Sequence, residues 1–109
     1  MARSPDELAE LRAICPEASE MSEAGVTYYF LPKLKVPGAG ELDGLLRAQQ
    51  AASDGYTTRL FLSKPVEGKG QNWTEQRILD RTWHTWSYNN VPVTDRLSQI
   101  LVNHLRALR

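Results

Sequence analysis

Residues 81–93 combine aromatic anchors with side chains that can react or bind. Ser87 is a candidate nucleophile, and His84 is a candidate general base, provided that it reaches the hydroxyl that it activates. Asn89 and Asn90 could donate hydrogen bonds to a developing oxyanion. The stretch can therefore be a reaction site, a recognition surface or a packed core, and its residue types alone do not decide among the three.

The local conformation decides whether these groups meet. His84 and Ser87 would lie close together on a helix but on opposite faces of a strand. The apolar spacing within residues 78–86 permits a helix, whereas the β-branched and aromatic run 82–88 permits a strand. No acidic residue stands beside His84 in the sequence to orient the imidazole, and Asp80 lies one helical turn before it. The alternative to a reaction site is a core of tryptophans, in which His84 and Thr85 satisfy buried polar groups.

Other motifs in the chain carry weaker chemical signals. A metal site on His84 and His104 lacks a third ligand, so neither a metal nor another cofactor is expected. Gly68-Lys69-Gly70 lacks the spacing and the closing hydroxyl of a phosphate-binding loop. Cys15 is the single cysteine. It cannot form an internal disulfide, and we expect a buried, inert thiol in a reducing compartment.

The composition predicts one globular domain without a strong charge. The 109 residues include 13 basic and 13 acidic side chains, which cancel. A neutral chain has no global attraction for nucleic acid or for an anionic membrane. No run approaches the roughly 20 apolar residues of a membrane span, and the acidic N-terminal segment lacks a secretion signal. We therefore expect a cytoplasmic protein that binds neither nucleic acid nor membrane.

Helices are predicted near both ends of the chain. The first occupies residues 1–16, where Ser4 caps it and Glu7 completes a capping box. Thr94 is expected to cap the last helix. The buried stripe of that last helix consists of Leu97, Ile100, Leu101, Leu105 and Leu108. His104 falls on the same side, where we expect a partly buried packing histidine.

Strands are predicted between these helices. Residues 26–31 are rich in aromatic and β-branched side chains, and their alternation continues toward residue 36. Further strands are expected at 42–46 and at 56–63, whereas 17–24 suit a connector and 64–72 suit a loop. This order predicts an α+β fold in which helices cover one face of an antiparallel meander.

A family resemblance is carried by several short motifs. They are Gly55-Tyr56, Leu60-Phe61-Leu62, Gln71-Asn72-Trp73, Arg81-Thr82-Trp83-His84-Thr85-Trp86-Ser87 and Leu97 with His104-Leu105. These motifs resemble the bacterial ubiquitin-conjugating-enzyme-like (UBC-like) proteins, and are most similar to prokaryotic E-two family E. The resemblance implies a UBC-like fold with an N-terminal helix, an antiparallel β-meander, an active-site segment and a C-terminal helix. Residues 25–109 would form a minimal domain of this kind.

The same resemblance implies a set of partners. Such proteins occur with a ubiquitin-like protein, a ubiquitin-activating-type enzyme and a JAB-type isopeptidase. Cassettes of this composition are associated with anti-phage defence in bacteria.

The chain departs from the family at its nucleophile. Classical members carry His-Pro-Asn followed by a cysteine, and neither feature is present. Matching Trp86-Ser87 to the family's Trp-Ser places that cysteine near Ile78, where nothing nucleophilic stands. Cys15 precedes the first clear strand, and Asn89 replaces a histidine that is common in the family.

Two classes of function follow from this departure. In the first, a hydroxyl of Ser87 or Thr82 takes the acyl group as an ester, with assistance from His84 and Asn89. In the second, the protein is a non-catalytic variant that binds and positions the ubiquitin-like protein or its activating enzyme. A small-molecule-binding domain built on the aromatic cluster is a third alternative.

Overall fold

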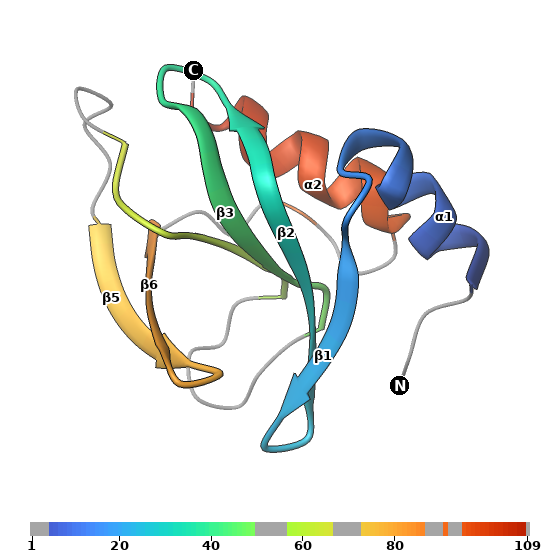
Figure 1. The fold of residues 1–109 in the computed structure, drawn as a ribbon, viewed down its shortest axis with the longest axis horizontal. Helices are drawn as coiled ribbons and strands as arrows, with labels where there is room; N and C mark the ends of the chain where they lie inside the picture. Colours follow the sequence, from blue (N-terminus) through green and yellow to red (C-terminus); the bar gives the residue numbers. More distant parts are fainter. Residues whose placement is uncertain (1–4, 50–56, 67–72, 87–90, 92–94, 109) are drawn as a thin grey trace.

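Two helices pack on one side of a curved antiparallel sheet (Figure 1). The structure, a computed structural model, describes residues 5–49, 57–66, 73–86, 91 and 95–108. The elements are α1 (Pro5–Ile14), β1 (Ser19–Glu23), β2 (Val26–Val36), β3 (Gly40–Arg47), β4 (Arg59–Leu62), β5 (Trp73–Ile78), β6 (Arg81–Trp86) and α2 (Leu97–Arg106). The strand order is β1-β2-β3-β4-β6-β5. The expected α+β class, with a helix near each end, is confirmed.

The sheet is larger than the sequence predicted, because both of its edges escaped detection. The segment expected as a connector contains β1, which pairs along its whole length with β2. Its five residues, Ser-Glu-Met-Ser-Glu, are almost entirely exposed and show no apolar alternation. An edge strand needs hydrogen bonds on one side only and no buried face, so composition does not reveal it. The prediction of a connector over residues 17–24 was therefore wrong.

The ambiguous segment before the last helix is a strand. β5 and β6 form a hairpin whose two turn residues, Leu79 and Asp80, have φ values of 52° and 60°. Positive φ at both positions is the mark of a type I′ turn, whose twist matches that of paired strands. β6 also pairs with β4 through His84 and Leu62. The helical alternative for residues 78–86 is excluded.

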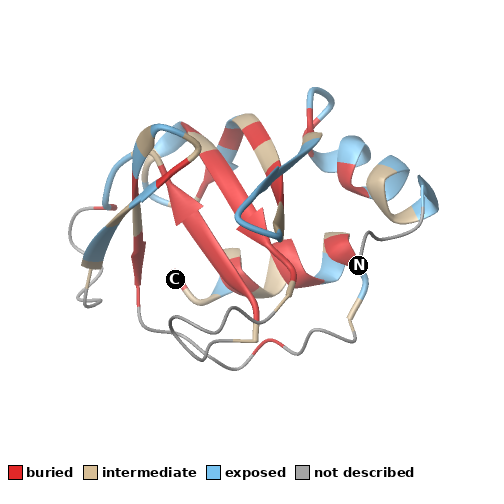
Figure 2. Ribbon diagram, turned by 90° about the horizontal axis from the view of Figure 1, so that it is seen from below, coloured by how far each residue is buried: buried red, intermediate tan, exposed pale blue. Residues whose placement is uncertain are grey.

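The larger core lies between the sheet and the helices. α2 buries Leu97, Ile100 and Leu101 completely, and all four residues of β4 are buried. Figure 2 shows that buried residues are concentrated in the central strands of the sheet. The predicted apolar stripe of the last helix is thus confirmed. Cys15 is 2% exposed and its Sγ lies 3.2 Å from the carbonyl oxygen of Pro32. Burial raises the pKa of this thiol, in agreement with the expected inert cysteine.

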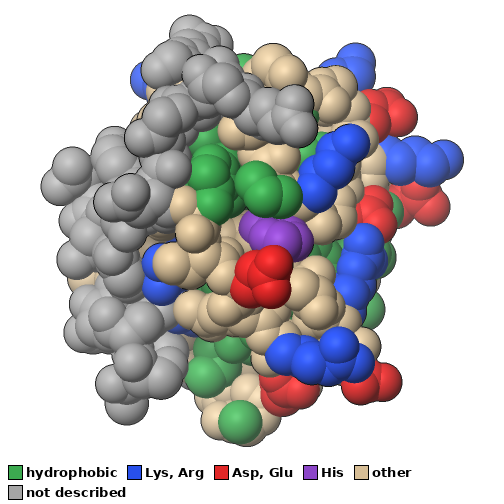
Figure 3. Space-filling view, turned by 90° about the vertical axis from the view of Figure 1, so that its left-hand side faces the viewer, with side chains coloured by type: hydrophobic (Ala, Val, Ile, Leu, Met, Phe, Trp, Pro, Cys, Tyr) green, Lys and Arg blue, Asp and Glu red, His purple; other side chains and the backbone are tan. Residues whose placement is uncertain are grey.

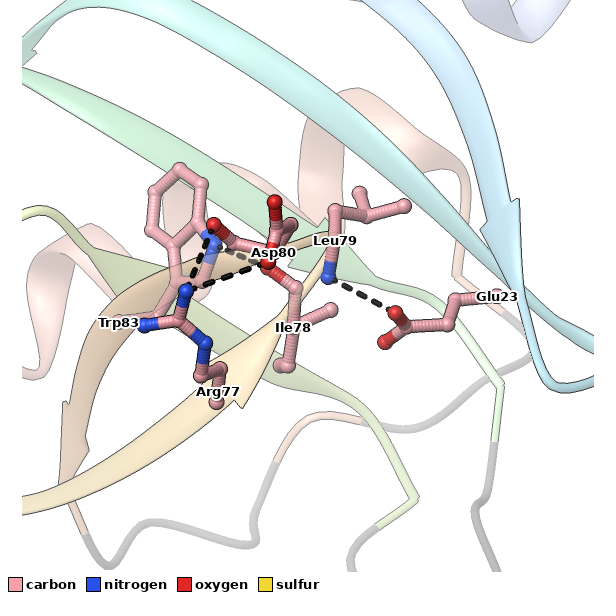
Figure 4. A network of polar contacts seen from close by, with 6 residues as sticks. All are labelled: Glu23, Arg77, Ile78, Leu79, Asp80 and Trp83. Atoms are coloured by element: carbon pink, nitrogen blue, oxygen red, sulfur yellow. Dashed lines mark hydrogen bonds and ion pairs between the residues drawn. The ribbon is translucent and has the colours of Figure 1, made fainter.

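A second core occupies the opposite face of the sheet, where the two hairpin tips approach each other. Its buried members are Tyr28, Leu45, Phe61, Ile78 and Trp83. The backbone N–H of Leu79 at the tip of the β5–β6 hairpin donates to Glu23 Oε1 of β1 over 3.1 Å (Figure 4). The Trp83 indole N–H donates to the carbonyl oxygen of Ile78 over 3.1 Å. The first bond joins the two ends of the curved sheet, and the second lies within the β5–β6 hairpin.

α2 is capped by α1 and not by its own sequence. The helix begins at Leu97 after Arg96, which makes no side-chain cap. The N–H of Leu97 donates to Glu7 Oε1 over 3.0 Å, and Arg96 pairs with Glu10 at 2.8 Å. A carboxylate at a helix N-terminus satisfies a free N–H and complements the helix dipole. The predicted start at Thr94, which lies outside the described residues, was therefore too early.

The β1–β2 turn offers a test of backbone strain. Ala24 and Gly25 have φ values of 52° and 79°, and both residues are exposed. Alanine pays roughly 1 kcal/mol in this left-handed region, whereas asparagine tolerates it. We expect Ala24→Asn to raise the free energy of unfolding by about 0.5–1 kcal/mol in urea titrations, with an unchanged m-value. Ala24→Ser is the control and should show no gain; equal gains in both variants would contradict this explanation.

Candidate functional site

The alternation of β6 assigns its side chains to two faces. Thr82, His84 and Trp86 share one face, because side chains two residues apart in a strand point the same way. Thr82 is exposed, the His84 side chain is 17% exposed, and Trp86 is 2% exposed. The strand therefore presents a hydroxyl and an imidazole at the surface and anchors them with a buried indole.

The partner strand β5 completes this surface. In the hairpin register, Glu75 lies opposite His84 and Arg77 lies opposite Thr82. The Glu75 carboxylate Oε1 is 4.0 Å from His84 Nδ1. Figure 3 views this side of the molecule and shows a histidine side chain against an acidic one, with apolar groups beside them. We call the surface formed by Glu75, Arg77, Thr82 and His84 the hairpin face.

Two tryptophans lie next to the hairpin face, at the end of the hairpin opposite its turn. Trp73 lies opposite Trp86 in the register, and their ring centroids are 5.2 Å apart. Trp73 packs against the larger core, to which Trp86 belongs. The expectation that tryptophans anchor the core is confirmed for Trp83 and Trp86, which are both 2% exposed. They enter different cores because an odd spacing in a strand sends side chains to opposite faces.

The other face of β6 is held by buried and half-buried polar contacts. The Thr85 hydroxyl donates to the carbonyl oxygen of Leu60 over 2.8 Å and accepts from Arg59 Nε at 3.2 Å. Thr85 is 0% exposed, so its expected role of satisfying buried polar groups is confirmed. Arg81 lies 4.6 Å from the centre of the Trp83 ring, a cation–π distance. These contacts fix the strand that carries the hairpin face.

Arg81 also forms an ion pair across the sheet. Its guanidinium donates to Asp43 Oδ2 over 2.9 Å, and the N–H of Lys33 donates to Asp43 Oδ1 over 3.2 Å. Burial acts to raise the pKa of Asp43, but these two hydrogen bonds outweigh it and lower the pKa. The arginine of the Arg-x-Trp motif therefore has a structural role in this fold.

The hairpin face can support acid–base chemistry. An imidazole at the surface of a strand can accept and return a proton, and the Glu75 carboxylate faces this one at 4.0 Å. Thr82 and His84 are two residues apart, so their backbone positions are separated by roughly 6.6 Å along the strand. Direct proton transfer between them needs closer approach or an intervening water. The structure thus brings Glu75 and His84 together and places Thr82 on the same face, whereas Ser87 and Asn89 lie outside the described residues.

Glu75 is the member of this site that sequence reasoning missed. It stands nine residues before His84, so no local spacing relates the two side chains. Their pairing follows from a two-residue turn at Leu79 and Asp80. Had that turn been assumed, counting outward from it would have placed the carboxylate opposite the imidazole. The signal was weak because leucine is unfavourable at positive φ.

The second histidine, His104, belongs to α2 and is buried beside Trp86, the last residue of β6. His104 is 1% exposed, its Nε2 lies 2.8 Å from Thr58 Oγ1, and its ring meets the edge of Trp86 at 6.3 Å. Burial lowers the pKa of His104 to about 4, assisted by the positive charges of Arg47 and Arg59. His104 is therefore neutral near pH 7, and the expected packing role is confirmed.

Within the ranges that the structure describes, no cluster of three or more His, Cys, Asp or Glu side chains could hold a metal ion. None of the described helices has the length and apolar character needed to cross a bilayer.

Comparisons with models of known protein families, with curated proteins and with solved structures find no match to this chain.

Proposed function

We propose that this protein is a UBC-like component of a bacterial ubiquitin-like modification system that carries the acyl group on a hydroxyl. The observation that supports this role most directly is the hairpin face. There an exposed hydroxyl and an imidazole with an adjacent carboxylate project from the strand that leads into Ser87. Cys15 does not offer an alternative nucleophile, because it is buried and its pKa is raised by that burial.

The order of elements is consistent with the proposal. An N-terminal helix precedes antiparallel strands, and the Arg-x-Trp-x-x-Trp motif is followed by a closing helix. The sheet differs from a simple meander in one respect, because β6 inserts between β4 and β5. That insertion places the motif beside the central strands and makes the hairpin face part of the sheet.

The reaction would transfer an acyl group from the activating-type enzyme. The hydroxyl oxygen of Ser87 or Thr82 attacks the carbonyl carbon at the C-terminus of the ubiquitin-like protein, and an ester bond forms. The bond to the group that carried the acyl chain breaks. His84 accepts the hydroxyl proton and returns it to the departing group. Asn89 would stabilise the oxyanion, and a JAB-type isopeptidase would reverse later conjugation.

A direct assay tests this proposal. The protein, the activating-type enzyme, ATP and the ubiquitin-like protein are mixed, and adducts are resolved by electrophoresis and mass spectrometry. We expect an adduct that hydroxylamine cleaves and that thiols leave intact, because it is an ester and not a thioester. Ser87→Ala is expected to abolish it. Persistence of the ester in Ser87→Ala and its loss in Thr82→Val would move the nucleophile to Thr82.

A non-catalytic role is the second candidate. It is favoured by the 4.0 Å separation of His84 and Glu75, which exceeds a hydrogen bond, and by the distance from His84 to Thr82. In that case the protein would bind the ubiquitin-like protein or the activating enzyme and position it. Calorimetry that detects binding, together with an assay in which the wild-type protein forms no adduct, would establish this role and exclude the catalytic one.

A further inference from the structure

β5 is an edge strand of the sheet, and part of its backbone is directed outward. The strand order ends at β5, so no strand of the described residues lies on its outer side (Figure 1). Ile78 pairs with Arg81 across the two-residue turn, which makes this a hydrogen-bonded pair. Hydrogen-bonded and non-hydrogen-bonded pairs alternate along the hairpin, so the N–H and C=O groups of Glu75 and Arg77 point away from β6. An edge of this kind is a template for another strand.

The same two residues carry opposite charges on one face of the edge. The side chains of Glu75 and Arg77 are 71% and 67% exposed. Arg77 contacts the carboxylate of Asp80 at 3.2 Å and its carbonyl oxygen at 3.3 Å. The Asp80 side chain is 97% exposed, and an ion pair in water contributes little. The guanidinium can therefore exchange this carboxylate for another one.

The spacing of the two charges makes β5 complementary to a second copy of itself. When two β5 strands run antiparallel about a two-fold axis at Gln76, Glu75 of each copy lies opposite Arg77 of the other. Opposite charges placed directly across an antiparallel pair stabilise it. In this register the outward N–H and C=O groups of Glu75 and Arg77 also meet each other. At the axis the two Gln76 amides can each donate to and accept from the other.

The other edge of the sheet lacks this complementarity. β1 has the sequence Ser-Glu-Met-Ser-Glu, with two acidic residues and no basic one. No register of two β1 strands therefore sets opposite charges across from each other. Pairing of β1 with β5 of another copy would be head-to-tail and would not close into a dimer. The formal net charge of the chain is zero, so two copies have no overall repulsion to overcome.

We propose that the protein forms a symmetric dimer through β5, in which the two sheets continue into each other across the two-fold axis. The second copy places its Arg77 beside the Glu75 that faces His84, and the two hairpin faces become one continuous surface. The inference does not depend on the proposed function, because it follows from the charges and the register of β5 alone. One strand from each copy makes a small interface, so we expect the dimer to dissociate on dilution.

Charge reversal tests the predicted register. Sedimentation equilibrium over a range of concentrations is expected to show a monomer and a dimer, and a protein that is monomeric at about 1 mM would overturn the proposal. Glu75→Arg and Arg77→Glu each place like charges opposite one another at both positions. We expect each variant to raise the dissociation constant of the dimer at least about ten-fold.

Mixing the two variants separates the interface from folding. In an equal mixture of Glu75→Arg and Arg77→Glu, a basic edge meets an acidic one, and we expect the heterodimer to form with about the wild-type affinity. A misfolded variant could not give this recovery. A mixture that stays monomeric while both variants keep the wild-type free energy of unfolding would overturn the proposal. Glu20→Arg in β1 is the matched control and should leave the dimer intact; dissociation by this variant would overturn the assignment to β5.

A cross-link locates the two-fold axis. Gln76 and its copy would form a non-hydrogen-bonded pair with about 4.5 Å between Cα atoms, a distance that a disulfide can span. We expect Gln76→Cys to give a covalent dimer on mild oxidation, since Cys15 is 2% exposed and does not compete. Thr74→Cys is the control, because in this register its two copies lie roughly 13 Å apart. A cross-link through Thr74→Cys and none through Gln76→Cys would overturn the register.

Discussion

His84→Gln is expected to slow ester formation by about 10²- to 10⁴-fold, the usual contribution of a general base. Glutamine keeps a polar side chain of similar length but cannot accept the hydroxyl proton near neutral pH. Because the imidazole is 17% exposed and therefore packed over most of its surface, the fold of the variant is checked by its free energy of unfolding. The measurement is a single-turnover rate at saturating activating enzyme, with affinity for the ubiquitin-like protein determined separately.

Two variants sharpen this test. Glu75→Gln removes the charge that faces His84 and is expected to give a smaller loss than His84→Gln. Lys35→Gln changes an exposed side chain in β2, remote from the hairpin, and serves as the matched control with wild-type activity. If His84→Gln reacted at the rate of the Lys35→Gln control, His84 would not be the base, and the hairpin face would lose its catalytic role.

The parts of the fold that the sequence predicted are those in which burial imposes a periodic pattern. Strand residues 26–31 and 42–46 were expected, and both lie within longer strands, β2 and β3. The last helix was found because leucine and isoleucine recur on one face that packs against the sheet. In each case the side chains on one side of the element are buried, so apolar residues recur in the sequence with the period of a helix or a strand.

The parts that were missed are held by contacts distant in sequence. β1 is polar and is a strand only because β2 lies beside it. The cap of α2 comes from Glu7, 90 residues upstream of Leu97, where a local search offered Thr94 instead. Glu75 meets His84 only through the hairpin register. A propensity or a spacing motif describes neighbours along the chain, and it contains no information about such pairs.

The candidate site also has a part that the sequence predicted and a part that only the structure shows. The sequence identified the stretch from Arg81 onward because it concentrates rings and polar groups, and the structure places a partly exposed imidazole there. What it left open was the conformation, since tryptophans three apart suit either a helix or a strand. The strand sends Trp83 and Trp86 into different cores and leaves the His84 side chain partly exposed.

Lowering the pH from 7 to 5 is expected to reduce the free energy of unfolding by about 2 kcal/mol through His104 alone. The folded protein holds the pKa of His104 at about 4, below its ordinary value of 6.5. Between these two values the unfolded chain binds a proton that the folded chain excludes. The stability that depends on the neutral imidazole is therefore complete above pH 6.5 and is lost as the pH falls toward 4. Urea titrations across this range measure it.

His104→Gln isolates this contribution from the carboxylates, whose titration lies mostly at lower pH. The variant is expected to be less stable at pH 7, because a buried bond to Thr58 is perturbed, but its stability should change by about 2 kcal/mol less than that of the wild type between pH 7 and pH 5. Lys35→Gln, which changes an exposed side chain in β2 and leaves both histidines in place, is the control and should keep the wild-type pH dependence. If His104→Gln retained the full slope, the imidazole would not be kept neutral by burial, and its contacts with Thr58 and Trp86 would have to be open to water.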